Sequence, residues 1–265
     1  METALDRMSS AASLQTADGV GYRPAPGAGL DRLIVALDFP SAGTAMDMVD
    51  QLQGTCRWFK VGMELYYAAG NSIVERLRRR GFEVFLDLKL HDIPNTVAGA
   101  VRSVGGTGAS LLTVHAGGGE RMMRAAALAA CAPDSPKLLA VTVLTSLSAA
   151  ELSAVGVGDA KDAGNVVRSQ VLRLARLAKV AGINGLVCSA DEVAAVREVM
   201  GQEALLVVPG IRPAGGDVGD QSRVATPAEA IARGASMLVV GRPITQAADP
   251  AKAAAEIVAE IAGVS

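Results

Sequence analysis

Residues 85–96 have the sequence Phe-Leu-Asp-Leu-Lys-Leu-His-Asp-Ile-Pro-Asn-Thr, and this stretch decides how the rest of the chain is interpreted. It predicts a β-strand, a short loop and a helix with Pro94 in its first turn. Because side chains alternate along a strand, Asp87 and Lys89 are expected on one face and the leucines on the other. An unpaired buried charge is costly. The two charges therefore form an internal ion pair or line a functional site, and the mixed charges on one strand favour a site.

The remainder of the chain repeats a pattern of apolar segment and helix. Eight strands are expected, at residues 32–39, 58–62, 83–90, 110–116, 137–145, 185–189, 205–211 and 237–240. Nearly continuous apolar strands are typical of a parallel sheet buried on both faces. Eight strand–helix units in 265 residues favour an α/β fold, a closed (β/α)8 TIM barrel, over an open doubly wound sheet. The first helix also lacks the Gly-x-Gly-x-x-Gly motif of dinucleotide-binding folds.

Composition limits the domain organisation and the kinds of partner. Residues 1–28 are rich in Ser, Ala, Gly and Pro, so we interpret them as a flexible extension and residues 29–265 as one barrel domain. No signal peptide or membrane span is expected. A net charge of −2 and 3% aromatic residues argue against nucleic acid as a partner. Three scattered cysteines and two histidines predict reduced thiols, a cytoplasmic location and no metal centre.

Polar residues follow the ends of most of the expected strands, where (β/α)8 barrels form their active sites. Acids and lysines alternate at the ends of three consecutive strands. The segments 209–213 and 241–243, which follow the last two strands, contain glycine and arginine and predict a phosphate site there. His91 is expected to pack locally, whereas His115 suits a structural and a binding role equally. The strand-end residues are Asp38, Lys60, Asp87, Lys89, His115, Thr145, Arg212 and Arg242.

Several longer motifs resemble those of one known family. They are ALD at 36–38, FKVG at 59–62, DLKLHDIPNT at 87–96, TVHA at 113–116, LTS at 144–146, PGIRP at 209–213, GDQ at 219–221 and GRPIT at 241–245. From residue 31 to the C-terminus, the chain resembles the orotidine 5'-monophosphate decarboxylases of the bacterial type. The Asp-x-Lys-x-x-Asp core is shared with other sugar-phosphate enzymes of the superfamily, and the remaining motifs are more specific.

The resemblance implies a cofactor-free and metal-free reaction. Orotidine 5'-monophosphate would lose CO2 to give uridine 5'-monophosphate, in the last step of de novo pyrimidine synthesis. Lys89 would stabilise the carbanion at C6 of the pyrimidine and protonate it, and Asp87 would lie beside the departing carboxylate. Asp38 and Lys60 would bind the ribose hydroxyls and complete the array of charges.

The resemblance also implies which residues bind the rest of the substrate. Thr145 would mark the edge of the site that recognises the pyrimidine. The phosphate would be held by Gln221, Gly241 and Arg242, with Arg212 at the root of a loop that closes over the substrate.

A homodimer is the last implication. Asp92, a catalytic residue by resemblance, would reach with Ile93 and Thr96 into the site of the partner subunit.

Two other interpretations of the function stay open. A metal-dependent sugar-phosphate decarboxylase or aldolase would need a carboxylate and metal-ion arrangement in place of Asp38 and Lys60. A non-catalytic nucleotide-binding barrel would have no need for charges that repel the substrate carboxylate.

Overall fold

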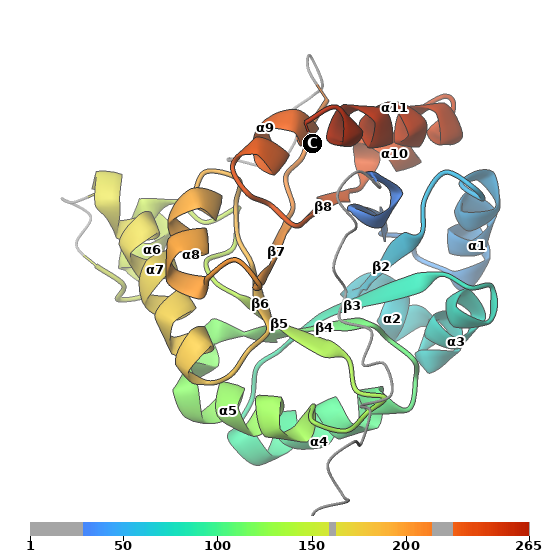
Figure 1. The fold of residues 1–265 in the computed structure, drawn as a ribbon. Coiled ribbons are helices and arrows are strands. Elements are labelled where there is room, and N and C mark those ends of the chain that lie inside the picture. Colours follow the sequence, from blue (N-terminus) through green and yellow to red (C-terminus); the bar gives the residue numbers. More distant parts are fainter. Residues whose placement is uncertain (1–28, 159–162, 214–224, 265) are drawn as a thin grey trace, which may run out of the picture.

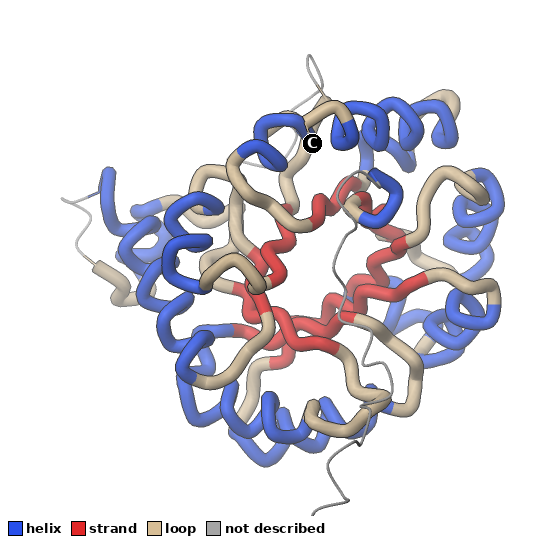
Figure 2. Tube along the Cα trace, viewed as in Figure 1, coloured by secondary structure: helices blue, strands red, loops and turns tan. Residues whose placement is uncertain are grey.

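The centre of the molecule is a closed barrel of eight parallel strands (Figures 1 and 2). The structure, a computed structural model, describes residues 29–158, 163–213 and 225–264. Each strand pairs with the next along the chain, and β8 pairs with β1 to close the ring. The (β/α)8 barrel expected from the sequence is confirmed. Its strands are β1 (Leu33–Leu37), β2 (Trp58–Gly62), β3 (Glu83–Leu90), β4 (Leu111–His115), β5 (Lys137–Val141), β6 (Gly185–Val187), β7 (Leu205–Val208) and β8 (Met237–Val240).

Helices surround the barrel on its outside (Figure 2). Two helices follow β2 where one was expected, because Gly70 takes a φ of 62° and interrupts the helical path. The helices are η1 (Gly29–Asp31), α1 (Ala42–Gln51), α2 (Met63–Ala69), α3 (Asn71–Arg79), α4 (Pro94–Gly105), η2 (Ala116–Gly118), α5 (Gly119–Ala129), α6 (Ala149–Ala154), α7 (Ala163–Val180), α8 (Val193–Met200), α9 (Pro227–Ala232), α10 (Arg242–Thr245) and α11 (Pro250–Ala262).

Helix ends follow short-range features of the sequence. Ser41 caps α1, because its hydroxyl accepts a hydrogen bond from the backbone N–H of Thr44 at 3.2 Å. Pro94 is the first residue of α4, as expected, since a helix needs no N–H there. Gly81 follows α3 with a φ of 84°, a conformation that ends helices and suits glycine.

Apolar side chains form two layers, one on each side of the strands. Along β1, Ile34 and Ala36 point into the barrel, whereas Leu33, Val35 and Leu37 pack outward against the helices. This alternation explains why the strands are apolar throughout. The interior layer comprises Ile34, Ala36, Trp58, Phe85, Leu111, Leu139, Leu205, Val207, Met237 and Val239.

Strand β3 departs from this regular pattern at its C-terminal end. Its pairing with β4 shifts register between Leu86 and Leu90. Within that interval Lys89 has a φ of 50°, and it is the only non-glycine residue with positive φ in the described part of the chain. A lysine in this conformation is strained, and such strain concentrates at functional sites.

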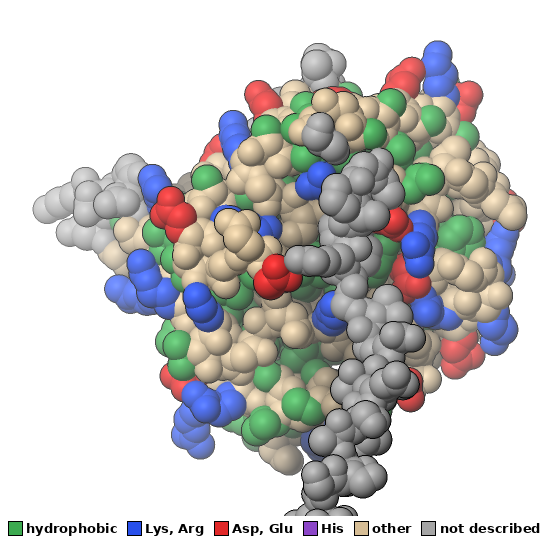
Figure 3. All heavy atoms as spheres, in the orientation of Figure 1, with side chains coloured by type: hydrophobic (Ala, Val, Ile, Leu, Met, Phe, Trp, Pro, Cys, Tyr) green, Lys and Arg blue, Asp and Glu red, His purple; other side chains and the backbone are tan. Residues whose placement is uncertain are grey.

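The outer surface has no charged region of one sign on the face seen in Figure 3, where acidic and basic side chains are interspersed among the described residues. This agrees with the small net charge of −2. In the part of the chain that the structure describes, none of the helices combines the length and apolar character needed to cross a membrane.

Candidate active site

Four charged side chains, three from β2 and β3 and one directly after β1, meet at the C-terminal end of the barrel. The Lys60 ammonium donates to Asp38 Oδ1 at 2.9 Å and lies 3.8 Å from Asp87 Oδ2. The Lys89 ammonium donates to both carboxylate oxygens of Asp87, at 2.9 and 3.0 Å. These side chains form one row of alternating charge, Asp38–Lys60–Asp87–Lys89, which we call the charge array. The pairing of β1 with β2 and of β2 with β3 places them side by side.

The middle of the charge array is shielded from solvent, and its ends are more open. The side chains of Lys60 and Asp87 are 12% and 13% exposed, whereas those of Lys89 and Asp38 are 28% and 60% exposed. Burying a charge is tolerable only with a well-placed opposite charge. Because each inner group has an oppositely charged neighbour on both sides, the array can exist before any ligand binds.

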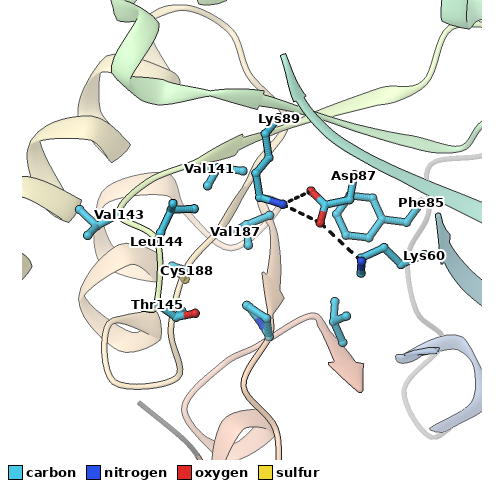
Figure 4. A pocket seen from close by; sticks show the side chains of 12 residues that line it. Lys60, Phe85, Asp87, Lys89, Val141, Val143, Leu144, Thr145, Val187 and Cys188 are labelled. Carbon is cyan, nitrogen blue, oxygen red and sulfur yellow. Dashed lines mark hydrogen bonds and ion pairs between the residues drawn. The ribbon is translucent and has the colours of Figure 1, made fainter. Parts of the chain in front are cut away.

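Three members of the charge array lie on one wall of a cavity of about 190 Å³ (Figure 4). Lys60, Asp87 and Lys89 line one side. The opposite side is mostly apolar and comes from β5, the segment after it and β6, with Thr145 as a polar group at its edge. The full lining is Lys60, Phe85, Asp87, Lys89, Val141, Val143, Leu144, Thr145, Val187, Cys188, Pro209 and Val239. A mostly apolar cavity with a few convergent charged groups is typical of a site for a small molecule.

Thr113 on β4 joins the site, although the sequence did not single it out. Its side chain is fully buried. The hydroxyl donates to Asp87 Oδ1 at 3.0 Å and accepts a hydrogen bond from the backbone N–H of Lys89 at 2.8 Å. A hydroxyl between the apolar residues of a buried strand, next to a charged strand, was the available signal.

Gly62, at the end of β2, is a second residue that the sequence did not single out. A Cβ atom here would lie 2.9 Å from Lys60 Nζ and 3.1 Å from Asp38 Oδ1. The φ of Gly62 is −86°, which any residue can adopt, so the backbone does not require glycine. Glycine here leaves the space that the Lys60–Asp38 pair occupies.

The residues expected to hold phosphate follow β7 and β8, at the same end of the barrel. Arg242 is exposed and is the first residue of α10. Gly241 lies near the array, since a Cβ there would be 3.9 Å from Asp38 Oδ2. The guanidinium of Arg212 donates to the carbonyl of Ile211 at 2.9 Å. Gln221 lies outside the described residues.

The residues expected to serve a partner subunit do not line the cavity of their own chain. Asp92 and Thr96 are exposed, and the apolar side chain of Ile93 is 67% exposed. The Asp92 carboxylate accepts a hydrogen bond from the backbone N–H of Ile93 at 2.6 Å, which fixes the start of the segment before α4.

Two histidines stack beside the charge array. The rings of His91 and His115 lie 5.1 Å apart and 15° from parallel, so His91 packs locally, as expected. The Nδ1 atom of His115 accepts a hydrogen bond from the backbone N–H of Gly117 at 3.2 Å. Burial, and then the charges of His91 and Lys89, lower the pKa of His115. Within the described ranges, no three His, Cys, Asp or Glu side chains are arranged to hold a metal ion.

The fold and the site define a (β/α)8-barrel enzyme with a charged cavity, and comparison with known proteins identifies its family. The model of the Orotidine 5'-phosphate decarboxylase / HUMPS family matches residues 31–257. The orotidine 5'-phosphate decarboxylase of Halorhodospira halophila is 54% identical over 88% of this chain and 97% of its own length. That of Anaeromyxobacter dehalogenans is 54% identical over 86% of this chain and 97% of its own.

Solved structures agree with the sequence matches. The crystal structure of orotidine 5'-phosphate decarboxylase from Lactobacillus acidophilus superposes with a TM-score of 0.75 at 39% identity, over 87% of this chain and 98% of that one. An uncharacterized conserved protein from Geobacillus kaustophilus gives 0.74 at 39% identity, over 86% and 99%. The chain belongs to the Orotidine 5'-phosphate decarboxylase / HUMPS family, and the expected enzyme class, a carboxy-lyase, is confirmed.

Proposed function

We propose that the protein converts orotidine 5'-monophosphate to uridine 5'-monophosphate and CO2 in pyrimidine biosynthesis. Relatives that are more than half identical over most of their length bear the name of this enzyme. The observation that supports the proposal best is the position of Lys89. Its ammonium is held by two hydrogen bonds to Asp87 on the wall of a cavity with a mostly apolar opposite side.

The reaction needs electrostatic stabilisation. When the bond from C6 to the carboxylate breaks, its electron pair stays on C6, where no adjacent π system delocalises it. Enzymes of other classes use an electron-sink cofactor for such a step. In this proposal no cofactor or metal takes part, because a fixed positive charge at the carbanion supplies the stabilisation.

Lys89 is the group proposed to do this. An ammonium at about 4 Å from the developing charge is worth about 4 kcal/mol at an effective dielectric of 20. After CO2 leaves, a proton passes from the Lys89 ammonium to C6, which forms the C–H bond of the product and leaves a neutral amine. Asp87 has a double role in this scheme: it holds the ammonium, and its charge opposes the substrate carboxylate before that group leaves.

The remaining residues would bind parts of the substrate that do not react. Asp38 and Lys60 would bind the ribose hydroxyls, and Thr145 would contact the edge of the pyrimidine. Arg242, with Gly241, Arg212 and Gln221, would bind the phosphate. Binding energy from a remote phosphate can position the ring and exclude water, and so can accelerate a step in which the phosphate takes no part.

A homodimer with shared sites is also part of the proposal. Ile93 is a large apolar side chain that is 67% exposed, and Asp92 beside it does not line the cavity of its own chain. Both features suit a segment that inserts into a partner. Mixing Lys89→Ala and Asp92→Ala subunits tests this, because a hybrid dimer would contain one site with both residues intact. Hybrids that form and stay inactive would contradict the shared site.

The thiols are consistent with the proposed cytoplasmic location. All three cysteines lie in the described part of the chain, and none forms a disulfide. Burial raises the pKa of the Cys56 thiol to about 12, so this group is unreactive at neutral pH.

One assay tests the main proposal. The absorbance change of orotidine 5'-monophosphate is followed with purified protein in the presence of EDTA. We expect turnover that the chelator does not affect, and no turnover with Lys89→Ala at an unchanged melting temperature. Lys252→Ala is the matched control, since Lys252 is an exposed lysine of α11 that lies 3.9 Å from Glu256 Oε1 and does not line the cavity. Inactive wild-type protein would contradict the function, and an active Lys89→Ala variant would contradict the role of the lysine.

A further inference from the structure

We propose that Thr113 is a positioning residue, whose hydroxyl fixes both the Asp87 carboxylate and the backbone of Lys89. The inference rests on the proposed function, because it concerns how the proposed proton donor is held. Thr113 does not line the cavity itself and would act through Asp87 and Lys89, which do.

The backbone of Lys89 needs a partner that the barrel does not supply. The β3–β4 ladder shifts register between Leu86 and Leu90, and Lys89 lies in this gap with a φ of 50°. A regular strand would pair its N–H with a neighbouring carbonyl. Here the N–H donates instead to the Thr113 hydroxyl at 2.8 Å. The side chain of Thr113 therefore stabilises the strained conformation.

The same hydroxyl orients the carboxylate. It donates its proton to Asp87 Oδ1 at 3.0 Å, and that oxygen also receives a hydrogen bond from the Lys89 ammonium at 3.0 Å. The Thr113 hydroxyl, the Asp87 carboxylate and the two ends of Lys89 thus form a closed ring of contacts. Only a group that donates and accepts at once can complete this ring. Thr113 is fully buried, so bulk water has no access to replace its hydroxyl.

Two substitutions separate the hydroxyl from simple packing. Thr113→Val keeps the volume and removes the hydroxyl, whereas Thr113→Ser keeps the hydroxyl and removes a methyl group. If the hydroxyl positions the catalytic groups, Thr113→Val lowers kcat about 10- to 100-fold, the range for lost hydrogen bonds to charged groups. Thr113→Ser then stays near wild type, and KM changes little in either variant. A packing role reverses this order, because the smaller serine would be the more damaging replacement.

Thr107 supplies a matched control. Its buried hydroxyl also donates to one group, the carbonyl of Val104 at 2.8 Å, and accepts from one N–H, that of Ala109 at 3.3 Å. It lies before β4 begins, at the opposite end of that strand from the site. Thr107→Val should lower the melting temperature and leave kcat unchanged.

The test is the kcat of these variants with orotidine 5'-monophosphate, together with their melting curves and the hydrogen-exchange rate of the Lys89 amide. We expect faster exchange at Lys89 in Thr113→Val and recovery in Thr113→Ser.

A Thr113→Val variant with wild-type kcat overturns the inference, as does a serine variant that is worse than the valine variant. If Thr113→Val does not fold, Thr113→Ala and Thr113→Ser are compared, and equal kcat values overturn it. Inactive wild-type protein would contradict the proposed function alone, since the exchange measurement still tests the role of Thr113.

Discussion

Replacing Gly62 by alanine is a sharp test of the charge array, because it adds one methyl group against the Lys60–Asp38 pair. The new Cβ would lie 2.9 Å from the Lys60 ammonium and 3.1 Å from Asp38 Oδ1. Ordinary contacts of this kind begin at about 3.4 Å, so the ammonium must move by about 0.5 Å. The movement stretches or breaks the 2.9 Å hydrogen bond between Lys60 and Asp38.

The cost to activity follows from this displacement. A misplacement of about 1 Å in a catalytic arrangement can cost about 100-fold in rate. The Lys60 ammonium, which is proposed to bind substrate, moves by about half of that distance. We therefore expect kcat/KM to fall about 10-fold in Gly62→Ala. Stability should change little, because the backbone at Gly62 suits alanine. Gly62 also precedes α2 as its N-cap, and replacing glycine at this position costs at most about 1 kcal/mol, or about 3 °C in Tm for a chain of this size.

Steady-state kinetics with orotidine 5'-monophosphate and a melting curve complete this test. Gly43→Ala is the control, since a Cβ at this position of α1 meets only Ser41 Oγ, at an ordinary 3.7 Å. It should keep full activity and gain stability, as glycine-to-alanine changes in helices do. A Gly62→Ala enzyme with wild-type kcat/KM would refute the idea that the space above Gly62 sets the array geometry.

Three further predictions concern other parts of the molecule. Arg242→Ala should lower kcat/KM for the nucleotide about 10- to 100-fold and leave binding of the nucleoside, which lacks the phosphate, unchanged. If the nucleotide and the nucleoside were weakened equally, Arg242 would not bind the phosphate. The wild-type protein should lose stability at acid pH because of His115, and His115→Asn should abolish this part of the fall in Tm. Burial, followed by nearby positive charge, lowers the pKa of His115 from 6.5, so the unfolded chain binds more protons and wild-type Tm falls as pH drops through that value. A variant with the same fall in Tm would contradict this. Arg197→Ala should lower Tm by about 10 °C with kcat retained, because its guanidinium donates to Ala204 O at 2.6 Å and to Ser236 Oγ at 3.1 Å, connecting α8 to the starts of β7 and β8. An unchanged Tm would show that this contact is not stabilising.

The strands could be predicted from the sequence because the barrel requires apolar side chains on both faces. Every observed strand lies within its expected range. The range 137–145 was too long, since β5 ends at Val141. The error has a physical cause: Val143 and Leu144 are apolar because they line the cavity, and this makes a loop resemble a strand.

The charged residues of the site could also be predicted from the sequence, but the contacts between them could not. Asp87 and Lys89 stand out because ionisable groups are rare in a buried strand. The register shift at Lys89 depends on pairing with β4, which no local pattern records. Gly62 and Thr113 act through the space or the hydrogen bonds that they offer to residues distant in the sequence. Contacts of this kind become visible only when the strands are side by side.

The balance of charge in the array has a consequence for the complete catalytic cycle. Two ammonium groups and two carboxylates sum to zero in the resting enzyme. In the proposed reaction the product takes a proton from Lys89, so the array ends each turnover one positive charge short. Water must return that proton before the next substrate binds, and the side chain of Lys89, at 28% exposed against 12% for Lys60, is the more accessible ammonium. The hydrogen at C6 of each product molecule would then come from the solvent: Lys89 takes up the proton after one turnover and transfers it to C6 in the next.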